Sequence, residues 1–368
     1  MSSESNEAGG YATHSHLVRR WRNLGRKLAF SGSGHQAWSA WRRKLRAKLL
    51  ELTGQDTMAT APLAPRVTEE HDFPGYRRQR VEITTEPGVV MPIFVLIPRD
   101  GRKAWPAVLA PHGHGGGGKS AVAGCHDNPQ VAAAIDEYNY DYGVQFARAG
   151  FVAFCPDARG FGERQEAPVQ HDILAGSCQY LNNAAIALGQ TILGMWVWDL
   201  RRLVDYVETR PDCLSGQVGC AGLSGGGMQT LWLSALDERV RCAVVSGYFY
   251  GCRESLLDMY NCACNYVPHL WEYVDMGDIG ALVAPRPLLI ETGDKDALNG
   301  AGGLANVRSQ VAVARRAYRL LGAGAALRHT IHHGGHKWFG GESIAWMRSH
   351  LDAKIMPVKS HRPERRRR

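Results

Sequence analysis

The segment Val218–Gly227, V-G-C-A-G-L-S-G-G-G, decides how the rest of this chain is interpreted. Its first four residues suit a short buried strand, and residues 225–236 that follow it predict a helix. Between the two stands the pattern G-x-S-x-G, which is typical of a strained turn that lifts a serine above the edge of a sheet. Glycine is expected on both sides of that serine because the backbones crowd there. The segment therefore predicts Ser224 as a nucleophile.

A serine hydroxyl is a poor nucleophile until a base takes its proton, and a carboxylate must orient that base. After a turn of this kind, the acidic residue comes next along the sequence and the histidine follows it. The loop after a later strand holds Asp294 and Asp296; we favour Asp296 and leave Asp294 open. Four histidines fall between residues 329 and 336, and His336, after two glycines, is best placed on an exposed loop. The predicted catalytic residues are Ser224, Asp296 and His336.

Short apolar runs alternate with helical patterns along most of the chain. We expect an antiparallel pair of strands over 80–85 and 89–97, around the turn at Pro87-Gly88. Further strands are expected at 107–110, 151–155, 218–221, 240–245, 287–290 and 327–331, with helices at 131–149, 190–209, 225–236 and 304–321. This alternation predicts an α/β fold, a mostly parallel twisted sheet with helices on both faces. The active site of such a sheet lies at the carboxyl ends of its strands.

Composition divides the chain into four parts. Residues 1–54 are expected to form a basic helical extension, with amphipathic helices over 14–30 and 38–52; residues 55–75 a linker; 76–353 the catalytic domain; and 354–368 a basic tail. The net charge of +8 comprises +8 in residues 1–50 and +6 in the tail, which leaves −6 for the residues between. The two helices are expected to pack on the main domain or on a sister subunit in a homo-oligomer, and membrane-surface binding is the alternative.

Composition also excludes several classes of protein. Hydrophobic residues make up 45% and charged residues 21%, the balance of an ordinary soluble globular protein, and no apolar run is long enough to span a bilayer. The polar start predicts no secretory leader. Nine scattered cysteines, an odd number, predict free thiols in a reducing compartment, so we expect a cytoplasmic protein. No segment matches a module that reads nucleic acid.

The loop after strand 107–110 supports two rival interpretations. An oxyanion needs preorganised N–H donors, and we expect them to be the backbone N–H groups of Gly225 and His114. The same loop, Gly113–Ser120, matches the phosphate-binding pattern G-x-x-x-x-G-K-S, with Lys119 on the phosphates, so a nucleotide-binding hydrolase is the alternative. Residues 121–129 start a helix poorly, however, and no suitable magnesium-binding aspartate follows. A non-catalytic binding protein is disfavoured because it would not need the three predicted catalytic residues.

Several further side chains are candidates with weaker predictions. His112, Arg159, Tyr248, Trp271 and Trp338 are expected near strand ends, where they could wall a substrate pocket. For Tyr248 and the two tryptophans, packing in the core is equally expected. For Arg159 we favour an ion pair with Asp157 that braces the loop. Cys262 and Cys264 are separated by one residue, cannot comfortably bridge each other and lack metal spacing, so they predict buried packing. We expect neither a metal nor a cofactor.

The sequence resembles a known group, the dienelactone-hydrolase-like and acetyl-xylan-esterase-like serine esterases of the α/β-hydrolase superfamily. The resemblance runs from about Trp38 to Leu351 and is carried by P-H-G-H-G at 111–115, P-D-A-R-G-F-G-E at 156–163, the Ser224 turn, A-P-R-P-L-L at 284–289 and G-G-H at 334–336. It implies the α/β-hydrolase fold, the same catalytic and oxyanion residues, and hydrolysis of small or acetylated, carbohydrate-type esters through an acyl-enzyme. Dienelactone hydrolases proper use a cysteine nucleophile, and the serine here points to ordinary ester hydrolysis.

Overall fold

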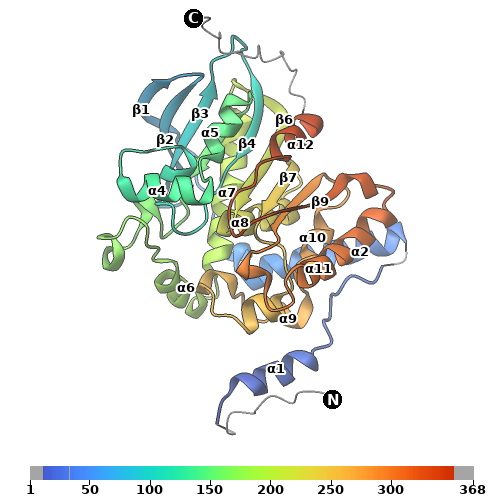
Figure 1. The fold of residues 1–368 in the computed structure, drawn as a ribbon. Helices are drawn as coiled ribbons and strands as arrows, with labels where there is room; N and C mark the ends of the chain where they lie inside the picture. The colour runs from blue at the N-terminus through green and yellow to red at the C-terminus, as the bar shows by residue number, and fades with distance from the viewer. Residues whose placement is uncertain (1–10, 33, 352–368) are drawn as a thin grey trace, which may run out of the picture.

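The computed structural model describes residues 11–32 and 34–351, built around one nine-stranded sheet (Figure 1). The strands lie in the order β1-β2-β3-β5-β4-β6-β7-β8-β9. Their bounds are β1 Arg66–Phe73, β2 Tyr76–Glu86, β3 Val89–Pro98, β4 Trp105–Leu109, β5 Val152–Pro156, β6 Cys213–Leu223, β7 Val240–Ser246, β8 Leu288–Gly293 and β9 Leu327–His332. Strands β4 to β9 pair in parallel, whereas β1, β2 and β3 form an antiparallel edge. The predicted α/β sheet is confirmed.

Helices cover both faces of the sheet, as predicted. Strand β5 shows the alternation, because Val152 and Phe154 belong to one hydrophobic cluster while Ala153 and Cys155 belong to the other. The first cluster is completed by α2 His35–Thr53, α7 Ile192–Thr209, α8 Gly225–Leu236, α10 Met276–Val283 and α11 Leu304–Leu320. The second is completed by α3 Lys119–Val122, α4 Pro129–Tyr138, α5 Tyr142–Arg148 and α12 Ser343–His350. The remaining helices are α1 His14–Arg22, α6 Cys178–Ala187 and α9 Leu270–Tyr273.

Three expectations about secondary structure are wrong. The predicted linker contains β1, whose side chains are mostly exposed and show no apolar alternation, because this edge strand is held by backbone pairing with β2. The helix predicted over 131–149 is two helices, since Asn139 takes a left-handed conformation (φ 53°) between them. The helix predicted over 14–30 ends at Arg22.

The N-terminal extension packs on its own main domain. Helix α2 buries Trp38, Leu45 and Leu49 in the first hydrophobic cluster, and Arg42 donates to Glu238 at 2.7 Å. Gly54 ends α2 with a left-handed conformation (φ 71°), and a Cβ there would lie 2.4 Å from a backbone oxygen. Figure 1 shows α1 beyond α9, at one end of the molecule. Residues 1–10 and the predicted tail lie outside the described residues.

No helix in the described part of the chain combines the length and the apolar character needed to cross a membrane.

Packing of α2 predicts a measurable contribution to stability. Leu45 is fully buried, so Leu45→Ala should lower the free energy of unfolding by about 2–5 kcal/mol, measured by urea denaturation. The control is Leu17→Ala on α1, because Leu17 is 43% exposed and its truncation should cost no more than about 0.5 kcal/mol. Equal midpoints for the two variants would show that α2 is not part of the folded core.

Candidate active site

Ser224 lies in a strained turn between β6 and α8. Its backbone has φ 59° and ψ −122°, a conformation that non-glycine residues rarely adopt, and its N–H donates to the Ser246 carbonyl at 2.9 Å. A Cβ on Gly222 would lie 2.5 Å from the Gly226 backbone, and one on Gly226 would lie 2.1 Å from the Pro111 carbonyl oxygen. Both glycines are required by backbone crowding, as the sequence predicted.

His336 and Asp296 are joined by a hydrogen bond. His336 Nδ1 lies 2.7 Å from Asp296 Oδ2, while the other carboxylate oxygen of Asp296 accepts the Leu298 N–H at 2.9 Å. Only 5% of Asp296 is exposed, so its carboxylate is held in one orientation. A carboxylate on Nδ1 favours the tautomer whose Nε2 is free to accept a proton.

The imidazole of His336 packs against the turn after β7. Gly247 there has φ 60°, and a Cβ on it would lie 3.0 Å from His336 Cε1, so a side chain would displace the ring. The preceding residue, Ser246, accepts the hydrogen bond from Ser224. The turn after β7 thus holds both the histidine and the serine, and Ser224, Asp296 and His336 line one cavity of about 510 Å³.

Asp294, the alternative acid, lies on the outside of the same loop. Its carboxylate accepts the Gly334 N–H at 2.9 Å and lies 3.0 Å from His333 Nδ1. These two hydrogen bonds hold the pKa of Asp294 below its usual range. Asp294 therefore braces the loop that carries His336, and the geometry favours Asp296 as the residue that orients the imidazole.

The other two histidines of the cluster make different contacts. His329 Nε2 lies 3.1 Å from Thr292 Oγ1, and burial, with Arg315 and Arg308 nearby, lowers the pKa of His329 to about 4. His332 stacks on Phe339 with ring centroids 4.8 Å apart. Neither lines the cavity at Ser224.

Two buried tyrosines hold the loop after β4. Tyr142 donates to the Pro111 carbonyl at 2.6 Å, and Tyr140 accepts the Gly113 N–H at 2.7 Å and donates to the His114 carbonyl at 3.2 Å. Burial raises the pKa of both phenols, so they stay protonated. The sequence does not reveal this role, because the helical pattern over 131–149 places both tyrosines in the middle of one predicted helix.

The tyrosines leave the expected oxyanion donors available. Among the hydrogen bonds of the described residues, none uses the His114 N–H. Gly225 is the first residue of α8, where a backbone N–H has no acceptor within the helix. A Cβ on Gly225 would lie 3.2 Å from His114 Nδ1, so the two segments are in close contact.

Of the five predicted pocket residues, only Tyr248 lines the cavity. His112 is buried beneath it, where its Nε2 accepts the Ala158 N–H at 3.1 Å and burial lowers its pKa. Trp338 stacks on Tyr142 in the second hydrophobic cluster. Trp271 contacts Trp21 of the extension and lines a separate hollow there. None of these three rings walls the cavity: His112 is used in hydrogen bonding, and the two tryptophans are used in packing, the alternative that the sequence left open.

Arg159, the fifth candidate, forms a structural ion pair with partners other than the expected one. It donates to both oxygens of Asp199, at 2.7 and 3.0 Å, and to Glu86 at 2.6 Å. Asp157 instead binds Lys119. The predicted ion pair between Arg159 and Asp157 is therefore wrong. The acidic partners of Arg159 come instead from α7 and β2, which are distant in the sequence and lie beside Arg159 only in the folded chain.

The rest of the cavity wall mixes aromatic and polar groups. It includes Tyr138, Tyr140, Tyr250, Asn261, Cys262, Asn265, Lys295 and Leu298. These residues come from three segments of the chain, 138–140, 250–265 and 295–298. The arrangement offers ring faces for packing together with amide and ammonium groups for hydrogen bonding.

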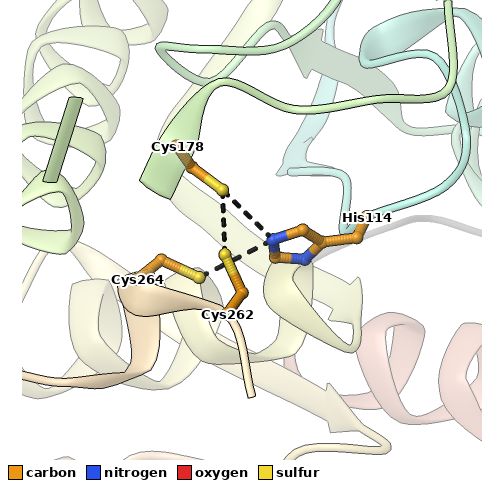
Figure 2. A group of neighbouring side chains, drawn as sticks. All are labelled: His114, Cys178, Cys262 and Cys264. Atoms are coloured by element: carbon orange, nitrogen blue, oxygen red, sulfur yellow. Dashed lines mark hydrogen bonds between the residues drawn. The ribbon is translucent and has the colours of Figure 1, made fainter. Parts of the chain in front are cut away.

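Cys262 and Cys264 do not simply fill space. Figure 2 shows their sulfurs facing Cys178, at the start of α6, and the imidazole of His114. Cys178 is 64 positions from His114 in the sequence and Cys264 is 150 positions from it, so no local spacing could have revealed the cluster.

Comparison with known proteins agrees with the fold. The model of the Abhydrolase family matches residues 13–353. The protein named "Putative hydrolase YtaP" of Bacillus subtilis (strain 168) is 27% identical over 228 residues, covering 60% of this chain and 70% of its own.

Solved structures share the architecture at low identity. The structure titled a "putative acetyl xylan esterase" from Bacteroides fragilis has a TM-score of 0.73 at 19% identity, over 89% of this chain and 84% of its own. A glucuronoyl esterase from Solibacter usitatus has a TM-score of 0.62 at 15% identity, over 88% and 97%. These likenesses establish a shared fold, and the family match extends across nearly the whole described chain. The chain therefore belongs to the Abhydrolase family of α/β hydrolases.

Proposed function

We propose that this protein is a serine carboxylic-ester hydrolase that acts through an acyl-enzyme. The observation that carries the proposal is the common cavity. It contains a serine on a strained strand-to-helix turn and a histidine already hydrogen-bonded through Nδ1 to a buried carboxylate. A nucleophile, a base and the group that orients the base are the parts that serine acyl transfer needs.

The chemistry follows from these positions. His336 Nε2 takes the proton of the Ser224 hydroxyl as the oxygen attacks the ester carbonyl, and Asp296 stabilises the imidazolium that forms. The N–H groups of Gly225 and His114 stabilise the oxyanion, with the second donor held in place by the tyrosines behind its loop. The imidazolium then gives its proton to the leaving alcohol. Water, activated by the same histidine, hydrolyses the acyl-enzyme and restores Ser224.

The substrate we propose is a small or acetylated ester with a carbohydrate-type alcohol. A cavity of about 510 Å³ suits a small molecule. Tyr248 and Tyr250 offer ring faces, and Asn261 and Lys295 offer donors for hydroxyl or carboxylate groups. The resemblance to acetyl-xylan-esterase-like enzymes supports the same class. Cytoplasmic location and self-association through the N-terminal helices stay predictions.

The alternative, a nucleotide-binding hydrolase, loses its main support. The side chain of Lys119 is 2% exposed, its Nζ lies 2.6 Å from Asp157 Oδ2, and it also contacts Glu163. The Lys119 N–H donates to the same aspartate at 2.7 Å. The helix that starts at Lys119 has only four residues. The ammonium that would meet a phosphate is thus already neutralised by two carboxylates.

The first test concerns the nucleophile. A fluorophosphonate probe should label Ser224, and Ser224→Ala should abolish labelling and lower kcat for a p-nitrophenyl acetate substrate by roughly 10⁴-fold or more. Ser246→Ala is the matched control, since that serine adjoins the site through its backbone carbonyl alone. Most of the activity surviving in Ser224→Ala would refute the proposal.

The second test separates the two aspartates. Asp296→Asn should lower kcat by about 10⁴-fold with the fold intact, because the amide favours the wrong histidine tautomer. Asp294→Asn should change kcat only a few-fold, since Asp294 holds the loop from outside. Steady-state kinetics with circular dichroism spectra would measure both. The opposite ranking would transfer the orienting role to Asp294.

The third test concerns Lys119. Lys119→Met leaves Asp157 buried without its partner, so it should lower the free energy of unfolding by about 3–5 kcal/mol. Lys27→Met, which removes a 59% exposed lysine from its ion pair with Glu272, should cost about 1 kcal/mol or less. Saturating ATP with magnesium should not raise the melting temperature of the wild type. A stabilisation of about 2.7 kcal/mol at 100 times Kd, lost in Lys119→Met, would favour the nucleotide enzyme.

A further inference from the structure

Four potential metal ligands meet beside the candidate active site. They are His114 Nε2 and the sulfurs of Cys178, Cys262 and Cys264, and all four atoms lie within 4.8 Å of one another (Figure 2). Cys178 and Cys264 are buried, and the other two are partly buried. We propose that these side chains bind one Zn²⁺ ion, which ties three separate segments of the chain together at the wall of the cavity.

The ligand type and the spacing both suit zinc. Three cysteines and one histidine are a recurrent set for a structural zinc ion. Bonds of about 2.3 Å to sulfur and 2.1 Å to nitrogen, at tetrahedral angles, place a sulfur about 3.6 Å from the nitrogen. His114 Nε2 lies 3.6 Å from Cys178 Sγ and 3.7 Å from Cys264 Sγ. Cys178 and Cys262 are closer, with their sulfurs 2.9 Å apart, and would separate by several tenths of an ångström around an ion.

The local backbone turns Cys262 and Cys264 toward the same point. Cys262 is extended (φ −61°, ψ 144°) and caps the short turn Ala263–Asn265. Asn265 closes this turn, because its amide donates to the Cys262 carbonyl at 3.0 Å and lies 3.6 Å from Cys264 Sγ. Tyr248 in turn donates to the Asn265 oxygen at 2.9 Å. An N–H group directed at a ligating sulfur is a common outer contact of a thiolate site.

A disulfide explains the cluster less well. A bond between Cys178 and Cys262 would use two of the four groups and leave Cys264 Sγ facing His114 Nε2. One metal ion satisfies all four groups together. Because the protein supplies four ligands, the tetrahedral site is closed, with no position left for substrate or water, and the role we assign to the ion is structural.

The position of the ion has a consequence for the loop after β4. Ligation through Nε2 would fix the ring of His114, whose Nδ1 side packs over Gly225. The same ion would hold the first turn of α6 and the loop that carries Cys262 against that ring. Binding of the ion does not depend on the proposed ester hydrolysis; only the benefit to the oxyanion loop rests on that function.

The test measures metal binding by the full chain. Untagged protein purified with a reductant and without chelator should contain about one zinc per chain by elemental analysis. The stripped protein should take up one Co²⁺ and develop the intense visible bands of a tetrahedral site with thiolate charge-transfer absorption. Cys264→Ser and Cys178→Ser should each lose most of this metal, and a chelator should lower the melting temperature of the wild type.

The matched control is Cys242→Ser. Cys242 lies on β7 and is as buried as Cys264, at 1% exposure each, so it reports the cost of a buried serine without touching the cluster. It should keep one equivalent of metal and the Co²⁺ spectrum. If Cys264→Ser unfolds, Cys262→Ser replaces it, because the side chain of Cys262 is only partly buried. Its Co²⁺ spectrum is then compared with the spectrum that Cys242→Ser should retain.

Two results would overturn the proposal. One is no Zn²⁺ or Co²⁺ uptake by the reduced chain, whether or not Cys178 and Cys262 form a disulfide before reduction. The other is equal uptake by the Cys264 and Cys242 variants. Fluorophosphonate labelling of Ser224 is measured on the same samples. Labelling without metal would refute the zinc site alone, and metal without labelling would refute the esterase alone.

Discussion

Close contact between the turn at Ser224 and the loop after β4 is the constraint on which the rest of the site depends. Gly226 approaches the Pro111 carbonyl so closely that no side chain fits between them. The contact brings the N-terminus of α8 against the segment that carries His114. This contact between the turn and the loop is possible only because β4 and β6 are parallel neighbours in the sheet and end at the same edge. A strained serine backbone can persist there because the surrounding segments leave it no relaxed alternative.

The loop after β4 is held from several directions, which accounts for much of the chemistry around it. Tyr140 and Tyr142 bind its backbone from the side of α5, and Lys119 at its end is buried against Asp157. The imidazole of His114 lies beside the three cysteines. A segment with this many glycines would otherwise be free to move. Such fixation suits the oxyanion donor that we propose in this loop, because such a donor must already point at the developing charge when the reaction begins.

The two aspartates on the loop after β8 make different contacts with the loop after β9. Asp296 faces inward to His336, whereas Asp294, two residues earlier, faces outward to the Gly334 backbone. One carboxylate orients the imidazole and the other fixes the loop that carries it. The side chains first expected to wall the pocket are largely used elsewhere, since Trp338, His112 and Arg159 make buried packing, hydrogen-bond or ion-pair contacts.

The sequence by itself determined the alternating strands and helices, the turn at Ser224 and the pairing of residues 294–296 with the loop that ends at His336. Each of these rests on local spacing: apolar runs, glycines at a crowded turn, and an acid and a base after successive strands. It did not reveal β1, which has no apolar pattern and exists through pairing with β2. Tertiary structure alone decided which aspartate contacts His336 and which acidic residues pair with Arg159 and Lys119. It also decided that the side chains of three distant cysteines, Cys178, Cys262 and Cys264, meet that of His114. The physical reason is that such partners are selected by side-chain direction and by contacts between segments far apart in the chain, neither of which is encoded in local spacing.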